Sequence, residues 1–178
     1  MKTNEAKTIK YAGIEWVVLE ENERGYFCLS KEHLFEKAFD ISCYNNWSKS
    51  SLREYLNGEW FDSLPEKDAF LPFEIDLTSD DGLKDYGVST DKIGLITCDQ
   101  YRKYRYIIGT KDTWWWTATP RTCSPGASHA AGGSTTRYVN PDGTVQNNYS
   151  ARGIIGVAPA CFLDKSVICN LNIGESKK

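Results

Sequence analysis

The run WWWTAT at residues 114–119 constrains the fold of this chain more than any other segment. Aromatic and β-branched residues favour a strand, and Pro120 closes the run because proline has no backbone N–H to donate to a neighbouring strand. Successive side chains of a strand point to opposite faces, so Trp115 is expected to face away from Trp114 and Trp116. We expect two of the three rings to lie in the core and one to remain at a rim, where it can stack against a ligand.

The segment NPDG at residues 140–143 predicts a tight turn between two short strands, at 138–139 and 144–145. Pro141 fixes φ at the first central position of this turn, and Gly143 accepts the left-handed conformation. The last third of the chain is therefore expected to be rich in strands.

The first half of the chain predicts one hairpin and one main helix. The hairpin joins strands at 8–19 and 26–30, and the helix lies within 46–60, capped by Ser50 or Ser51. Further predictions are a short helix at 66–70, a surface loop at 74–91, a strand at 91–98 and a short polar turn or helix at 99–106. The segment 154–163 is predicted to hold a core strand that ends at Pro159 or just after it. This order of elements predicts an α+β fold with an early helix and a β-rich, loop-rich C-terminal half.

The chain has 178 residues, enough for one domain with its own core. We predict a single domain over residues 1–178, with the core at about 8–170. No run approaches the roughly 20 apolar residues of a membrane span, so membrane insertion is not expected. The formal net charge of −3 and the lack of a basic stripe argue against nucleic-acid binding. Residues 59–92 hold ten acidic residues against three lysines, whereas residues 113–163 hold only four charged residues.

The chain contains six cysteines, no CxxC motif and no apolar segment near its N-terminus that would direct export. These features predict reduced thiols, several of them buried.

Neither a metal site nor a catalytic site is predicted. The two histidines, His33 and His129, have no neighbours at metal-ligand spacing, and the acidic stretch 76–82 does not fit the spacing of a calcium loop. Cys123 and His129 form the only local pair that resembles a nucleophile and its base, and nothing marks a third group. We therefore predict no cofactor and no catalytic residue.

Six short motifs occur in an order that resembles a bacterial and prophage family, that of the domain of unknown function 6273. They are IxWxVL at 14–19, WSxSSLRxYLN at 47–57, KIGLIT at 92–97, WWWTATP at 114–120, YVNPDGTV at 138–145 and GVAPA at 156–160. The resemblance covers residues 14–163. Ala158 stands where the family usually has an arginine before the proline, so no role of that arginine is carried over.

The late segment of that family is in turn similar to the C-type-lectin-like fold of formylglycine-generating enzymes and of retroelement-diversified receptor-binding proteins. The resemblance implies a compact scaffold whose long loops present variable side chains. Together with the lack of an export signal, it leads us to expect a cytoplasmic or phage-associated protein. Because a fold does not determine a function, the function has to be argued from the residues themselves.

Tyrosine, serine, glycine, asparagine and arginine make adaptable recognition surfaces, and the charge-poor last third is rich in them. The candidate ligand-binding residues are Trp115, Arg121, Arg137, Asn147, Asn148, Tyr149 and Arg152. They favour a non-enzymatic recognition module that binds a glycan or a protein partner. Two alternatives remain: a thiol-dependent enzyme that uses Cys123 or Cys161, and a structural or assembly component of a prophage or surface system.

Overall fold

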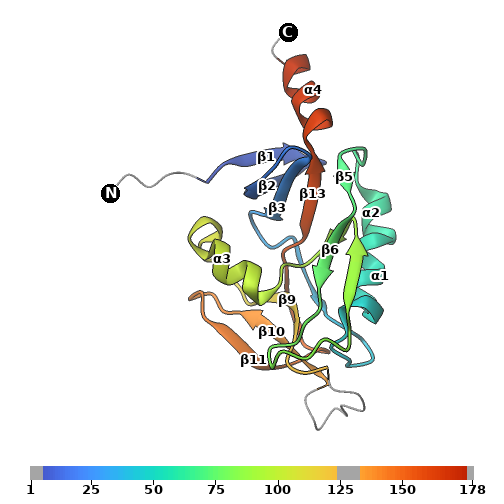
Figure 1. The fold of residues 1–178 in the computed structure, drawn as a ribbon, viewed down its shortest axis with the longest axis vertical. Helices are drawn as coiled ribbons and strands as arrows, with labels where there is room; N and C mark the ends of the chain where they lie inside the picture. The colour runs from blue at the N-terminus through green and yellow to red at the C-terminus, as the bar shows by residue number, and fades with distance from the viewer. Residues whose placement is uncertain (1–5, 124–132, 176–178) are drawn as a thin grey trace.

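The protein is described by a computed structural model over residues 6–123 and 133–175 (Figure 1). A first sheet has the strand order β1-β2-β3-β13-β5, with β8 also paired to β13. Its strands are β1 (Thr8–Tyr11), β2 (Ile14–Glu21), β3 (Gly25–Ser30), β13 (Ala160–Asp164), β5 (Phe70–Leu71) and β8 (Ile93–Gly94).

A second sheet has the order β11-β10-β9-β12-β4, in which β9 and β12 run parallel and the other neighbours antiparallel. Its strands are β11 (Val145–Ser150), β10 (Thr135–Val139), β9 (Trp115–Pro120), β12 (Ile154–Val157) and β4 (Phe35–Ala38). A separate hairpin pairs β6 (Phe73–Asp76) with β7 (Val88–Asp91).

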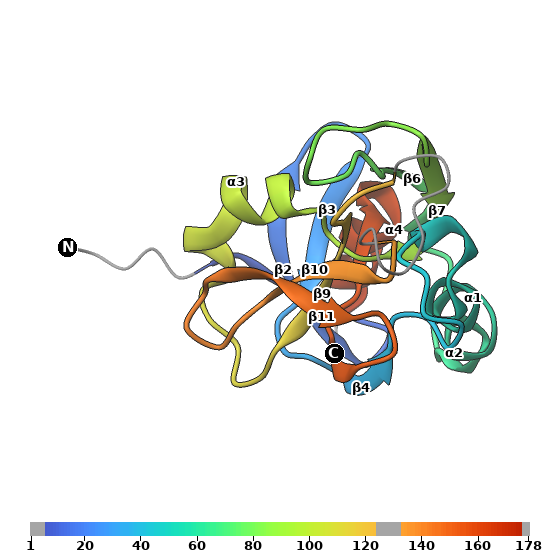
Figure 2. The same cartoon turned by 90° about the horizontal axis from the view of Figure 1, so that it is seen from below.

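The helices lie on opposite sides of the sheets (Figures 1 and 2). Helix α3 (Cys98–Ile108) is on one side, and the 3-10 helix η1 (Trp47–Lys49) with α1 (Ser51–Asn57) and α2 (Glu59–Ser63) is on the other. Helix α4 (Lys165–Glu175) follows β13 and projects from the rest of the molecule (Figure 1). Within the described residues, no helix is long and apolar enough to cross a membrane.

The α+β prediction is confirmed, and the differences from it occur where the backbone turns. The strand predicted at 8–19 is two strands, because Ala12 and Gly13 both have positive φ and reverse the chain. The helix predicted at 46–60 is divided into η1, α1 and α2, with a break at Gly58. The helix predicted at 66–70 is absent, and the segment leads into β5.

Two further differences concern strands. The loop predicted at 74–91 contains most of β6 and all of β7, because Ile75 and Ser89 are buried while their neighbours are exposed. The strand predicted at 154–163 is divided between the two sheets, which it joins through Ala158 and Pro159. The turn or helix predicted at 99–106 is a helix and forms part of α3, which begins with a capping box between Thr97 and Gln100.

Polar side chains of the motif WSxSSLRxYLN join η1 and α1 to the β7–β8 segment by hydrogen bonds and an ion pair. The carboxylate of Asp91 accepts hydrogen bonds from Trp47 Nε1 at 2.9 Å and Ser89 Oγ at 2.7 Å, and it pairs with the guanidinium of Arg53 at 2.7 Å. Asn57 bonds both the N–H and the carbonyl of Ile93, at 3.1 and 2.8 Å. The polar residues of this motif therefore have structural partners.

Lys111 is a buried cation in the connection between α3 and β9. Its side chain is 5% exposed, its Nζ donates to the carbonyl of Ser30 at 3.0 Å and to that of Lys31, and it lies 5.6 Å from the centre of the Trp115 ring. Burial lowers the pKa of Lys111 to about 8, because the charged form loses hydration.

We expect Lys111 to make stability depend on pH. Its pKa is lower in the folded chain than in the unfolded chain, where it is about 10.4, so the unfolded chain binds more protons between these values and folding gains stability as the pH rises. Relative to Lys111→Met, the wild-type free energy of unfolding should rise by roughly 2 kcal/mol between about pH 7 and pH 9.5. Urea unfolding of both proteins, under reducing conditions, measures this, and an equal difference at both pH values would contradict it.

Candidate functional site

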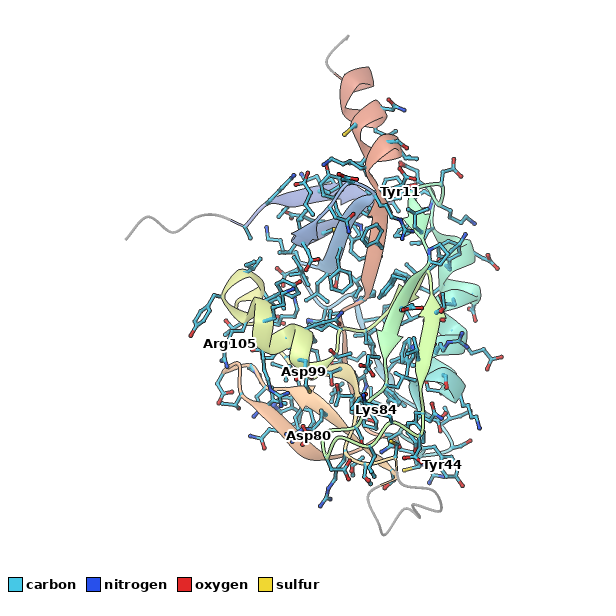
Figure 3. The ribbon with its side chains drawn as sticks, in the orientation of Figure 1. Tyr11, Tyr44, Asp80, Lys84, Asp99 and Arg105 are labelled. Carbon is cyan, nitrogen blue, oxygen red and sulfur yellow. The ribbon has the colours of Figure 1, made fainter. Side chains whose placement is uncertain are left out.

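Five connecting segments gather at one end of the molecule, the lower end in Figures 1 and 3. We call it the loop end, and it comprises residues 40–46, 79–86, 120–123, 133–135 and 151–152. Backbone hydrogen bonds join these segments: Asp40 N to Ala151 O at 2.9 Å, Asp80 N to Pro120 O at 2.9 Å, Arg121 N to Thr135 O at 3.0 Å and Asn45 N to Gly133 O at 3.0 Å.

Asn45 is the central polar residue of the loop end, and it is completely buried. Its Nδ2 donates to the carbonyls of Thr122 and Thr135 at 3.1 and 2.9 Å, and its Oδ1 accepts from the hydroxyl of Tyr86 at 2.8 Å. Both ends of the amide are therefore used, and a single side chain fixes three other segments of the loop end.

Cys123 provides a second anchor at this end. Its Sγ lies 3.2 Å from the carbonyl of Leu83 and 3.5 Å from the hydroxyl of Ser79. The thiol is buried, so the segment 79–86 is held against 120–123 by a small side chain that packs and donates.

A hollow of about 410 Å³ opens beside Asn45. It is lined by Asp40, Ser42, Tyr44, Asn46, Lys49 and Tyr86. Tyr44 is 53% exposed, and Figure 3 shows it at the outer margin of the loop end. The carboxylate of Asp40 accepts from the backbone N–H groups of Tyr44 and Ser51, both at 3.0 Å, which fixes the wall that carries Tyr44.

Two of the predicted ligand-binding residues, Arg121 and Arg152, are exposed at the loop end. Arg152 Nε donates to the carbonyl of Ile41 at 3.2 Å, so its guanidinium lies beside the segment that lines the hollow. Arg137 is different: its side chain is only 14% exposed and pairs with Asp80 at 3.0 Å. Arg137 lies where the register of β10 shifts, and its ion pair with Asp80 connects that strand to the segment 79–86.

The placement of Trp115 at a ligand surface is wrong. Its side chain is 1% exposed and packs edge-on against Tyr101 of α3, with ring centres 5.6 Å apart. Trp116 is also buried and packs against Phe39, so the exposed ring of the run is Trp114, at 46%. One ring of the three is exposed, as predicted, but it is Trp114, because α3 covers the face of β9 that carries Trp115.

Asn147, Asn148 and Tyr149 belong to β11, whose backbone pairs with β10. Their side chains lie outside the described residues, as does His129. Their predicted role in ligand binding stays a prediction.

The residues that sequence reasoning missed at this end are Tyr44, Asn45 and Tyr86. The segment DISCYNN at 40–46 has the tyrosine, serine and asparagine composition of a recognition loop, as the last third of the chain does. Tyr86 lies in the acidic stretch, where the charges obscured it.

Among residues 6–123 and 133–175, no group of three or more His, Cys, Asp or Glu side chains is arranged to hold a metal ion. The described cysteines form no disulfide. Burial raises the pKa of the Cys98 thiol, and it raises that of Cys161 well above its ordinary value.

These environments predict which thiols react. Cys43 and Cys169 are at least partly exposed, whereas Cys28, Cys98, Cys123 and Cys161 are buried. Because the thiolate is the reactive form and needs access, iodoacetamide at neutral pH should modify two thiols rapidly and four only as the protein unfolds. Intact-mass spectrometry over time counts them, with urea-unfolded protein as the control, and rapid labelling of Cys123 would instead favour a thiol-dependent enzyme.

Comparison of the chain with models of protein families, with curated proteins and with solved structures gave no match.

Proposed function

We propose that the protein is a non-enzymatic recognition module that binds a glycan in the hollow of the loop end. The observation that carries this proposal is the hollow of about 410 Å³, in which two tyrosines, Tyr44 and Tyr86, lie among hydroxyl, amide and ammonium groups. Tyrosine rings supply flat apolar area for sugar faces, and short polar groups supply hydrogen bonds to sugar hydroxyls.

The polar lining of the hollow divides into fixed and available groups. Asp40 and the hydroxyl of Tyr86 are occupied by hydrogen bonds that hold the loops. The side chains of Ser42 and Lys49 have no hydrogen bond to another described residue, so their donors can serve a ligand. A preformed wall with a few available donors is the arrangement that lets a ligand bind at low ordering cost.

A glycan array tests this proposal. It is probed with wild-type protein and with Tyr44→Ala, each in calcium and in EDTA. We expect binding in both buffers and a loss of about tenfold or more in affinity for Tyr44→Ala, because the variant removes the exposed ring that a sugar would stack on. Tyr106→Ala is the matched control, since Tyr106 is 96% exposed on α3 and lies outside the hollow.

Three results would contradict the proposal. Equal binding by Tyr44→Ala would remove the hollow as the site. Binding that disappears in EDTA would indicate metal ligands in the acidic loop. The absence of any glycan signal would shift the function to a protein partner.

A further inference from the structure

A second concave surface runs from Asp80 along the first turns of α3, and the proposed function does not use it. It consists of two adjoining hollows of about 480 and 370 Å³, which share Glu74, Asp99 and Gln100 as lining residues. We call it the α3–β6 groove. Figure 3 shows Asp99 at the start of α3, on the side toward β6.

The charged residues that line the α3–β6 groove are mainly acidic. Its carboxylates come from Glu20, Glu74, Asp76, Asp80 and Asp99, and its cations from Arg102 and Lys103. Lys103 pairs with Glu20 at 2.9 Å, and Arg102 pairs with Asp99 at 2.6 Å and with Asp80 at 3.6 Å. Arg102 and Lys103, the two cations of the groove, therefore form ion pairs with three of its five carboxylates.

The two remaining carboxylates, which form no ion pair within the described residues, are neighbours on one face of β6, and Lys84 contributes to lowering the pKa of Asp76. Within the described residues, Glu74 has no hydrogen bond or ion pair from its carboxylate, and Asp76 accepts only from the N–H and hydroxyl of Thr78. Residues i and i+2 of a strand share a face, so both charges project in the same direction, about 7 Å apart along the strand. This spacing matches basic residues at alternate positions of an extended segment.

The second hollow adds an aromatic floor. Phe27, Phe73, Phe162 and Tyr104 line it, and the ring centres of Phe27 and Phe73 are 5.6 Å apart. Phe73 and Phe162 are only partly buried, so an apolar side chain of a ligand would cover them further. The floor lies beside Glu74, at the Phe73 end of β6.

No strand of residues 6–123 or 133–175 pairs with the edge of β6 that faces α3. The hairpin has two strands, and in Figures 1 and 2 β6 lies on its α3 side. Leu77 N donates to Gly87 O at 3.0 Å. Hydrogen-bonded pairs alternate along an antiparallel ladder, so Ile75 and Phe73 are the other residues of β6 whose backbone groups face β7. The backbone groups of Glu74 and Asp76 therefore point away from β7, toward the groove.

We propose that the α3–β6 groove binds an extended, basic segment of a partner protein, which adds to the free edge of β6. Alternate lysine or arginine side chains of that segment face Glu74 and Asp76, and an apolar side chain covers Phe73 and Phe162. Main-chain hydrogen bonds provide affinity and the side-chain pattern provides specificity, as in other cases of strand addition.

The charges of the groove favour this occupant over others. A nucleic acid or an anionic membrane surface is repelled by a groove with five carboxylates and two cations. A second copy of this chain, pairing through the same edge, would place Glu74 and Asp76 against their own counterparts, and acidic edge residues oppose such pairing.

The test uses a fluorescein-labelled, acetylated and amidated eight-residue peptide, with three lysine–valine pairs between terminal phenylalanines, and fluorescence anisotropy on the full chain. We expect wild-type protein to bind it, with an affinity that falls as salt is added. Glu74→Gln/Asp76→Asn should bind about tenfold or more weakly, because the two charges that form no ion pair are removed while the side-chain shapes are kept.

Matched controls separate charge from strand addition. Glu23→Gln/Glu59→Gln removes two exposed acids outside the groove and should bind like the wild type. A peptide whose lysine and valine residues are all N-methylated keeps the charges but lacks the N–H groups for pairing in either strand direction, and it should bind weakly. The proposal is overturned if the wild type does not bind the lysine peptide, if the groove variant binds as well as the wild type, or if the N-methylated peptide binds equally well.

Discussion

Asp91→Ala should lower the free energy of unfolding by about 3–5 kcal/mol, the range expected when one partner of a buried charged network is removed. Asp91 is only 2% exposed, and its carboxylate accepts from Trp47, Ser89 and Arg53. In the alanine variant the indole N–H and the serine hydroxyl remain buried without their acceptor, which adds the cost of unsatisfied polar groups.

The cost should be large because Asp91 joins elements that have few other polar connections. Trp47 begins η1, Arg53 lies in α1 and Asp91 ends β7, so one carboxylate connects the helical side of the molecule to the β6–β7 hairpin. Trp47 also packs against Phe39, at 5.9 Å between ring centres, and this contact places the network at the edge of the main core.

Urea unfolding followed by tryptophan fluorescence measures this loss, with two further variants. Asp91→Asn keeps one acceptor oxygen but loses the charge, so its loss should be intermediate. Glu15→Gln breaks the exposed pair with Lys31, at 3.0 Å, and should cost less than about 1 kcal/mol. If Asp91→Ala also lowers the free energy of unfolding by less than about 1 kcal/mol, the hydrogen bonds of Asp91 do not stabilise the β6–β7 hairpin.

Features governed by local backbone chemistry could be predicted from the sequence. The NPDG turn is formed, with Gly143 at φ +82°, because proline and glycine restrict the chain wherever it lies. The cap at Ser50 is formed for the same reason, since its hydroxyl accepts from Arg53 N at 3.1 Å. Both signals act over a few residues and need no tertiary partner.

Features that depend on distant partners could not be predicted. Nothing near Trp115 indicates that α3 covers its face, and nothing near Arg137 indicates that Asp80 neutralises it. The acidic stretch hides the strands β6 and β7, because their exposed positions carry the charges and their buried positions are few. Charge and composition located a polar surface, whereas the positions of its side chains are set by tertiary contacts.

Asn45→Ala should combine a loss of stability with a loss of ligand binding. The variant leaves the Thr122 carbonyl and the Tyr86 hydroxyl, both partly buried, without their partner, for a cost of roughly 1–3 kcal/mol. Because Asn45 holds the segment that carries Tyr44, glycan binding should weaken by more than the fraction of unfolded protein explains. Asn140→Ala is the matched control, since that amide makes an exposed hydrogen bond to Thr144 at 2.9 Å, and its loss should cost less than about 1 kcal/mol.

Asn45→Asp tests the same network through its polarity. The aspartate keeps the acceptor for Tyr86 but places a carboxylate oxygen against the carbonyls of Thr122 and Thr135, where the amide had donated. Burial and this repulsion both raise the pKa of the new carboxyl, so the folded state binds a proton more readily than the unfolded state does. Its stability should therefore rise as the pH falls from about 7 toward 5, relative to Asn45→Ala, because the protonated acid can again donate to one carbonyl. Thermal unfolding across this range measures the difference, and parallel curves for the two variants would mean that Asn45 does not donate to these carbonyls in the folded protein.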